Sequence, residues 1–334
     1  MLQLVFGRSG YGKTEYIRNR IADKIDRGET QVLLITPEQY SFISEYSLLE
    51  QLGEARAHAV RCLSFSRLCD ECDRLYGADG RKPLTKGGKA ILMKTAIDRV
   101  RPDLELFEKK GSSAAFVQSM TGIYDEMKSC NLSGAAVYAA ADDLDTDILR
   151  CKMRDFSRIM TAYEALLGDR FADPANRLTR LYDQIKDQNY FAGQTVFLDG
   201  FNGFVAQEYK ILERIIAEAK AVYIALDSDS FGTGDGYDLF AYVNETAGIL
   251  QRIADKAGVP TNALQLSENC RTDYADLRRV EQYIFADQAP ETEIPAEHIR
   301  LYAASTVTDA CNDLALQIKG LLRCGYRAGE IAVT

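Results

Sequence analysis

The sequence predicts an α/β fold in which a parallel sheet is interrupted by a mostly helical insertion. Three observations favour this fold class. Apolar runs typical of buried strands alternate with helical patterns in both terminal parts of the chain. A glycine-rich segment directly follows the first of these runs. The middle of the chain, from Gly80 to about Gln188, carries helical periodicity without a good strand pattern.

The chain up to residue 78 alternates strands and helices. Strands are expected at three apolar runs, residues 2–6, 31–36 and 59–65. Helices are expected where apolar residues recur three or four positions apart, in residues 15–21, 42–52 and 66–75. Gly28 and Pro37 interrupt the pattern between these elements. Such alternation indicates a parallel sheet with right-handed crossovers.

The middle of the chain, residues 79–189, is expected to form the insertion. Gly77 and Gly80 break the preceding strand and helix pattern. Amphipathic helices are then expected at residues 90–100, 114–127 and 152–167.

The sheet resumes after residue 190. Strands are expected at residues 195–201, 221–226 and 263–266. Helices are expected at residues 207–219 and 239–257, and a loop at residues 228–237. Residues 286–297 contain two prolines without periodicity and predict a linker. The last residues predict a strand, a helix and a strand, at 299–303, 308–322 and 331–334, as at the start of a second α/β domain. Because the chain stops inside such a strand pattern, we expect it to be part of a longer protein.

Length, composition and charge narrow the class of protein. The 334 residues fit two or three domains, and 46% hydrophobic residues allow a sizeable core. A net charge of −9 argues against a globally basic nucleic-acid binder, although local basic patches remain compatible with it. With no leader pattern, no membrane-length apolar stretch and eight dispersed cysteines, a cytoplasmic location with reduced thiols and no membrane contact is expected.

The strongest candidate site is the glycine loop, which we define as residues 7–14. Its residues are Gly7, Arg8, Ser9, Gly10, Tyr11, Gly12, Lys13 and Thr14, which match the phosphate-binding pattern G-x-x-x-x-G-K-[ST]. Glycines allow backbone amides to turn onto phosphate oxygens, with the positive end of a helix dipole behind them. Lys13 would reach the outer phosphates, and the Thr14 hydroxyl would hold magnesium. The loop therefore predicts a P-loop NTPase that binds ATP with Mg²⁺.

Asp199 is the second candidate, because it follows an apolar strand at the edge where parallel sheets bind ligands. With the glycine loop upstream, it is expected to hold the same magnesium ion, although an aspartate that merely begins a turn is the alternative. ATPases of this type usually place a glutamate next, to polarise water, but position 200 is glycine. Glu208 is the nearest carboxylate, a helical distance away. The sequence therefore favours nucleotide binding over rapid hydrolysis, and no catalytic residue is assigned.

Other candidates are weaker on the residues alone. Arg271 is a possible clamp on the terminal phosphate or an ordinary solvated arginine. The segment 81–101 is rich in lysine and arginine, which fits either a basic stripe for nucleic acid or a solvated helix face. Ser64, Phe65 and Arg67 suit a single strand with a stacked base, although Phe65 fits the core equally well. Cys69-x-x-Cys72 lacks the second ligand pair of a closed zinc site.

The order of these motifs resembles that of superfamily 1 DNA helicases. The glycine loop looks like helicase motif I, residues 197–199 like motif II, and Leu266-x-x-Asn269-Cys270-Arg271 is similar to the L-x-x-N-Y-R motif with its phosphate-sensing arginine. Residues 36–39 and 64–68 lie where motifs Ia and Ib contact DNA. The resemblance thus implies DNA contacts at Thr36, Gln39, Ser64, Phe65 and Arg67.

Within that superfamily, the chain resembles the B subunits of the AddAB helicase–nucleases. The phrases GRSGYGKTEYI, TPEQYSF and FLDGF carry this likeness, which covers the whole chain. The resemblance implies a RecA-like domain 1A (residues 1–78 and 190–285), a helical domain 1B (79–189) and the linker and truncated start of a RecA-like domain 2A (286–334). It also implies an A-type helicase–nuclease partner, Chi recognition, and a nuclease domain with an iron–sulfur cluster outside this chain, so none of its cysteines is assigned to that cluster.

Three departures fit such a subunit better than an active motor. Motif II lacks its glutamate, the motif III region at residues 227–231 lacks the glutamine that senses the terminal phosphate, and Cys270 replaces the adenine-stacking tyrosine. The leading hypothesis is a nucleotide-binding, helicase-like scaffold in a heterodimeric enzyme that resects DNA breaks for recombinational repair. An autonomous superfamily 1 helicase and a non-helicase P-loop NTPase are the alternatives.

Overall fold

The computed structural model describes residues 1–78, 80–110, 113–229, 239–286 and 290–334. The chain divides into two compact units, Met1–Arg271 and Thr272–Thr334. The first unit contains a six-stranded sheet with its covering helices, here called the sheet lobe, and a group of inserted helices, here called the helical lobe. Within the described residues, no helix is both long and apolar enough to cross a membrane.

The sheet is parallel, with strand order β3-β2-β6-β7-β1-β8. Its strands are β1 (Leu2–Gly7), β2 (Val32–Ile35), β3 (Val60–Leu63), β6 (Thr195–Leu198), β7 (Ala221–Asp227) and β8 (Thr261–Gln265). All six strands predicted for this sheet are present. Because β6, β7 and β1 are neighbours and parallel, their carboxyl ends bring Asp199, Asp227 and Gly7 to one edge.

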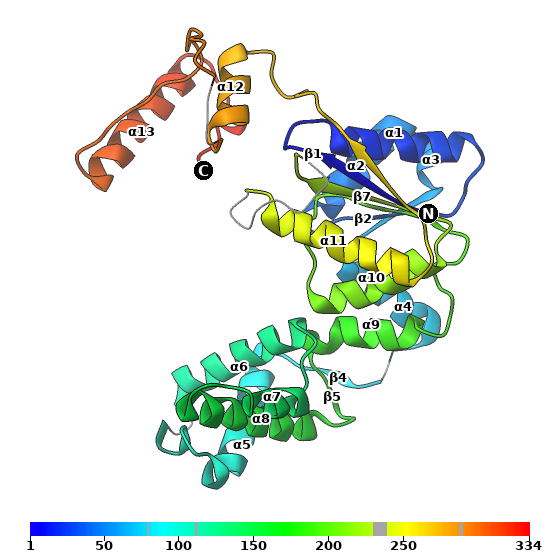
Figure 1. Cartoon of the computed structure of the whole chain (residues 1–334), viewed down its shortest axis with the longest axis vertical. Helices are drawn as coiled ribbons and strands as arrows, with labels where there is room; N and C mark the ends of the chain where they lie inside the picture. Colours follow the sequence, from blue (N-terminus) through cyan, green and yellow to red (C-terminus); the bar gives the residue numbers. More distant parts are fainter. Residues whose placement is uncertain (79, 111–112, 230–238, 287–289) are drawn as a thin grey trace. The chain divides into compact units, whose positions relative to one another are not determined.

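Helices cover both faces of the sheet (Figure 1). On one face lie α1 (Lys13–Asp26), α2 (Ser41–Leu52) and the short α3 (Glu54–Ala57), and on the other lie α4 (Phe65–Tyr76), α9 (Arg177–Ile185), α10 (Ala206–Glu218) and α11 (Ala241–Lys256). Successive strand residues point to opposite faces, so that Leu34 packs in the core beneath α1 and α2 while Leu33 packs in the core beneath α10 and α11. This pattern explains why the strands are apolar throughout.

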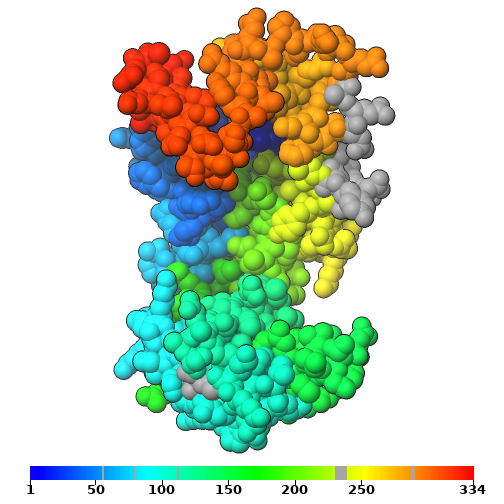
Figure 2. Space-filling view, turned by 90° about the vertical axis from the view of Figure 1, so that its left-hand side faces the viewer, coloured from blue at the N-terminus to red at the C-terminus, as the bar shows by residue number. Residues whose placement is uncertain are grey.

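The helical lobe has a core of its own, and Figure 2 shows it in cyan to green. Its helices are α5 (Lys86–Val100), α6 (Ala114–Ser129), α7 (Gly134–Ala141) and α8 (Asp147–Leu167). The rings of Tyr124 and Tyr163 meet edge to face at its centre, with centroids 4.7 Å apart. Single 3₁₀ turns complete the first unit at Glu38–Tyr40, Arg101–Asp103, Glu108–Lys110 and Pro174–Asn176.

Two features of the inserted region differ from a purely helical segment. The chain enters and leaves the helical lobe through a two-residue parallel pair, β4 (Lys82–Pro83) and β5 (Phe171–Ala172), where no strand was predicted. Pairs this short leave no periodic pattern in a sequence. In addition, α9 falls inside residues 79–189 but packs against α4 and α10, with Leu181 and Ile185 in the core of the sheet lobe.

The lysines and arginines of residues 81–101 do not form one basic surface. Lys89 is only 8% exposed, and its ammonium group lies 2.9 Å from the fully buried carboxylate of Asp173 and in an ion pair with Asp125. The hydroxyl of Tyr163 donates a hydrogen bond of 2.6 Å to the same Asp173 carboxylate. Lys94 pairs instead with Asp98 at the surface. Lys89 and Lys94 therefore do not contribute free charges to a basic stripe along this segment.

The second unit contains α12 (Ala275–Tyr283), α13 (Val307–Arg323) and a 3₁₀ turn at Ala328–Glu330. The strands predicted at residues 299–303 and 331–334 are wrong, since neither segment pairs with another strand in the described part of this unit. A strand exists only where a neighbour completes its hydrogen bonds. Most of the predicted loop 228–237, and residues 287–289 of the predicted linker, lie outside the described residues.

Candidate functional site

The glycine loop turns sharply between β1 and α1. Gly10 and Gly12 both have left-handed backbone conformations, with φ of 88° and 77°, which residues with a Cβ rarely adopt. Gly12 is the N-cap of α1 and offers no side chain to its first amides, whereas six later helices begin with a capping hydroxyl, from Ser64, Thr85, Ser113, Ser133, Thr146 and Thr306. The amides of the first turn therefore point into open space at the positive end of the helix dipole, which is a suitable place for an anion.

Residues 266–271 lie across this loop. The amide of Leu266 donates to the carbonyl of Phe6 at 2.8 Å, and the amide of Cys270 donates to the carbonyl of Gly10 at 2.9 Å. A Cβ atom added to Gly10 would lie 2.9 Å from the Cβ of Arg271, closer than two such atoms can approach. Only glycine therefore fits at position 10, and Arg271 lies directly against the loop.

Lys13 is held inside the loop. Its ammonium group donates to the carbonyl of Gly7 at 2.7 Å and to that of Arg8 at 2.9 Å, and it forms an ion pair with Asp227. Arg8 points elsewhere, since its guanidinium pairs with Asp229 at 2.9 Å and lies 5.5 Å from the ring centroid of Phe240. Of the two cations in the loop, Lys13 is therefore the one that lies at the carboxyl ends of the strands.

Thr14 and Asp199 meet beside Lys13. Asp199 is 9% exposed, and its carboxylate accepts a hydrogen bond from the Thr14 hydroxyl. Burial raises the pKa of Asp199, and this effect is opposed by the bonds from Thr14 and the Gly200 amide and by the charge of Lys13. A hydroxyl and a carboxylate side by side are oxygen ligands of the kind that magnesium takes, together with phosphate oxygens.

These groups line one cleft of about 660 Å³, here called the loop cleft. Its charged and polar side chains include Ser9, Lys13, Thr14, Glu15, Arg18, Thr36, Asp199, Asp227 and Arg271. The volume suits a drug-sized or nucleotide-sized ligand. The left-handed glycines, the open amides, the cation and the hydroxyl–carboxylate pair all fit a phosphate group with a divalent cation.

The position directly after Asp199, where a general base is usual, is a glycine and supplies no carboxylate. Gly200 has φ of 82°, and a Cβ there would lie 3.3 Å from Pro37, so a glutamate at this position would be strained. Glu208 accepts a hydrogen bond of 2.9 Å from the Val205 amide and lines a different cavity. Burial raises the pKa of Glu208.

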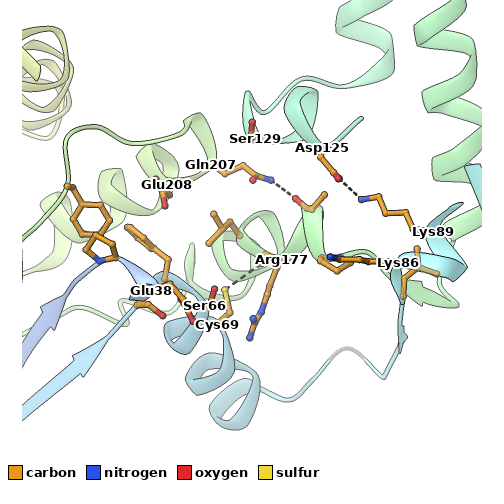
Figure 3. A pocket seen from close by; sticks show the side chains of 18 of the residues that line it. Glu38, Ser66, Cys69, Lys86, Lys89, Asp125, Ser129, Arg177, Gln207 and Glu208 are labelled. Carbon is orange, nitrogen blue, oxygen red and sulfur yellow. Dashed lines mark hydrogen bonds and ion pairs between the residues drawn. The ribbon is translucent and has the colours of Figure 1, made fainter. Parts of the chain in front are cut away.

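That second cavity, here called the interlobe cavity, has a volume of about 710 Å³ and lies between the sheet lobe and the helical lobe (Figure 3). Among its labelled polar side chains are Glu38, Ser66, Lys86, Lys89, Asp125, Ser129, Arg177, Gln207 and Glu208. Figure 3 shows the Lys89–Asp125 ion pair on its helical side. The side-chain amide of Gln207 donates a hydrogen bond of 3.0 Å to the carbonyl of Ala175. Cations and anions are thus mixed along its walls.

The residues predicted to contact DNA are only partly brought together. Thr36, Ser64 and Phe65 line the interlobe cavity, and Thr36 lines the loop cleft as well. Phe65 is 6% exposed and packs edge-on against Phe201, with ring centroids 5.8 Å apart, so it is mainly a core residue.

The other predicted contacts have different surroundings. Ser64 accepts a hydrogen bond from the Arg67 amide and so caps α4. Gln39 is exposed, and the Arg67 guanidinium pairs with Glu45 at 3.1 Å. Neither Gln39 nor Arg67 lines the cavity.

Sequence reasoning missed several residues of both sites. Asp227 in the loop cleft could have been found, because it ends an apolar strand in the same way as Asp199. Lys86, Arg177 and Gln207 carry no such signal, since only the packing of the two lobes brings them together. Cys69 and Cys72 are buried, which raises the pKa of both thiols to about 12, and the described residues contain no metal-binding group of three or more His, Cys, Asp or Glu side chains.

The sequence of this chain is similar to those of one family of known proteins. A sequence model of the family described as ADDB, N-terminal, matches residues 4–281. The chain is similar to the B subunit of the ATP-dependent helicase/deoxyribonuclease of Clostridioides difficile (strain 630), with 28% identity over 96% of the chain and 29% of that relative. Proteins of the same name from Clostridium botulinum (strain Langeland) and Clostridium acetobutylicum are each 27% identical, over 99% and 77% of the chain and 30% and 22% of the relatives. The chain thus spans less than a third of the length of these proteins.

Proposed function

This chain belongs to the family described as ADDB, N-terminal, and from that premise we propose that its loop cleft binds ATP together with Mg²⁺. In this proposal the sheet lobe is a RecA-like P-loop domain within the B subunit of a helicase–nuclease. The observation that carries it is the meeting of the open helix terminus at Gly12, the Lys13 cation and the Thr14–Asp199 pair in one cleft.

The residues of the glycine loop would share the work of binding. The amides at Gly10 and Gly12 would surround phosphate oxygens, and Lys13 would neutralise the outer phosphates. Thr14 and Asp199 would hold the magnesium ion, which supplies charge compensation when bound. Arg271, whose Cβ lies against Gly10, would approach the terminal phosphate from residues 266–271.

The same geometry favours occupancy over rapid hydrolysis. A general base must lie within hydrogen-bond reach of the water that it activates. Glu208 lines the interlobe cavity, and the backbone of Gly200 disfavours any side chain at the position next to Asp199. Asp227 lines the cleft but is held in an ion pair with Lys13. The chain is accordingly a nucleotide-binding scaffold in this proposal, and turnover belongs mainly to a partner subunit.

Removal of the Asp199 charge tests the magnesium site. We expect Asp199→Asn to bind ATP in EDTA at least as well as the wild type does, but to lose most of the gain in affinity that magnesium gives the wild type. Equilibrium binding of a fluorescent ATP analogue measures both. Glu15→Gln, which changes a second acidic residue of the cleft, is the matched control. An unchanged magnesium effect in Asp199→Asn would contradict the assignment.

The rest of the proposal concerns the longer protein. Its relatives are named as subunits of a helicase/deoxyribonuclease. We propose a heterodimer with an A-type helicase–nuclease subunit that resects double-strand DNA breaks and responds to Chi, with the nuclease domain and its iron–sulfur cluster outside this chain. Residues 1–78 with 190–285, 79–189, and 286–334 would be its domains 1A and 1B and the start of 2A.

For DNA, we propose that a single strand passes the interlobe cavity and contacts the wall that carries Thr36 and Ser64. Lys86 lines this cavity and is exposed, whereas Lys94 on the same helix pairs with Asp98 outside it. Gln39, Phe65 and Arg67 remain proposed contacts, although Phe65 would need to leave the core to stack on a base.

Substitution of Lys86 tests this route. Lys86→Ala is expected to weaken binding of a single-stranded oligonucleotide and to lower the slope of log affinity against log salt by about 0.7, as expected when one phosphate contact with a single strand is lost. Lys94→Ala should change neither quantity. Fluorescence anisotropy over a salt series provides the measurement, and equal effects of the two substitutions would refute the cavity as the DNA route.

A further inference from the structure

Asp227 is the charged partner of Lys13, the lysine of the glycine loop. It ends β7, and its backbone lies opposite Gly7 in the parallel register of β7 and β1. From there its carboxylate forms an ion pair with the ammonium group of Lys13. The Lys13 side chain is 10% exposed and that of Asp227 is 42% exposed, so the pair faces the loop cleft from its wall.

The contacts of Lys13 account for its full hydrogen-bonding capacity. An ammonium group has three N–H donors. Two are directed to the carbonyls of Gly7 and Arg8, which belong to the loop wound around the lysine, and the third partner is the Asp227 carboxylate. A phosphate oxygen can therefore bind Lys13 only if one of these partners leaves. Asp227 is the one that carries a negative charge and the one that reaches the cleft from outside the loop.

The charges of the loop cleft oppose the replacement of Asp227 by a phosphate oxygen at Lys13. Lys13, Arg18 and Arg271 are its cations, and Glu15, Asp199 and Asp227 are its anions, so the lining is close to neutral. Asp199 contacts Thr14 and would be compensated by magnesium. Asp227 contacts Lys13 itself and would lie next to the incoming phosphate, where two negative charges repel each other.

Resting on the proposed nucleotide site, we propose that Asp227 is a built-in competitor of the phosphate group. Its carboxylate takes the third N–H donor of Lys13 and must be displaced when nucleotide binds there. The residue thereby sets the affinity of the cleft below the value that the glycine loop alone would give.

The test is Asp227→Asn, which keeps the shape of the side chain and removes its charge. We expect it to bind MgATP about tenfold more tightly than the wild type, because a like charge next to the phosphate is removed. Asp229→Asn is the matched control, since Asp229 is a second aspartate close to the end of β7 but pairs with Arg8 outside the cleft lining. Its affinity for MgATP should remain within about twofold of the wild-type value.

The readout is equilibrium binding of fluorescent ATP, with thermal unfolding to confirm that the variants are folded. Affinity that is unchanged or lower in Asp227→Asn would overturn the inference, and a lower one would indicate a magnesium ligand or a structural role instead. If the wild type binds MgATP in a manner that depends on Lys13 but Asp227→Asn binds no more tightly, only this inference fails. If neither the wild type nor Asp227→Asn binds, the proposed nucleotide site fails with it.

Discussion

Replacement of Lys89 by methionine is expected to lower the free energy of unfolding by about 3–5 kcal/mol, because it leaves a buried charge without its partner. The Asp173 carboxylate is fully buried and accepts hydrogen bonds from Lys89, Tyr163 and the Ala175 amide. Methionine fills a similar volume but cannot compensate the carboxylate. Asp173 also lies between β5 and α9, where the chain leaves the helical lobe. An uncompensated charge at Asp173 is therefore expected to destabilise this connection.

Chemical denaturation followed by circular dichroism measures this effect. Lys94→Met is the matched control, since it removes a lysine from the same helix whose pair with Asp98 is exposed at the surface. Exposed pairs contribute about 0–1 kcal/mol, so the control should remain close to the wild type. Equal losses in the two variants would mean that Lys89 does not compensate a buried charge.

Replacement of Lys13 by alanine is expected to weaken MgATP binding at least about 100-fold. Hydrogen bonds to charged groups are worth about 1.5–3 kcal/mol each, and Lys13 would make more than one with the phosphates. The substitution also removes the two bonds that hold the carbonyls of Gly7 and Arg8. The loop is therefore expected to be less ordered as well as less positively charged.

Arg20→Ala controls for the general loss of a cation from α1. Arg20 lies on the same helix but does not line the loop cleft, and its guanidinium lies 6.0 Å from the ring of Tyr223. Its affinity for MgATP should differ little from that of the wild type. Comparable losses in the two variants, or unimpaired binding by Lys13→Ala, would mean that the glycine loop does not bind the nucleotide. Thermal unfolding of each variant separates lost binding from lost folding.

Much of the sheet could be predicted from local pattern. Each strand of the parallel sheet is buried on both faces, so that runs such as residues 32–35 are apolar throughout and stand out in the sequence. The placement of Asp199 beside the glycine loop also followed, because parallel strands bring their carboxyl ends to one edge. The strands expected at residues 299–303 and 331–334 failed because an apolar run does not specify a partner.

Side-chain environments that depend on tertiary packing could not be predicted in the same way. Lysines within residues 81–101 look alike in sequence, yet Lys89 lies in the core of the helical lobe and Lys94 at the surface. The difference arises from Asp173, which lies 84 positions away along the chain. Likewise, the interlobe cavity is formed by residues of both lobes, from Thr36 to Glu208, and no local pattern describes such a meeting.

The central claim is that the loop cleft binds one ATP with magnesium. Isothermal titration of the wild-type chain with ATP, first in excess magnesium and then in EDTA, tests it most directly. We predict one ATP bound per chain in magnesium, with clearly weaker binding in EDTA. Absence of binding in magnesium, or a stoichiometry and affinity that Lys13→Ala leaves unchanged, would contradict this claim.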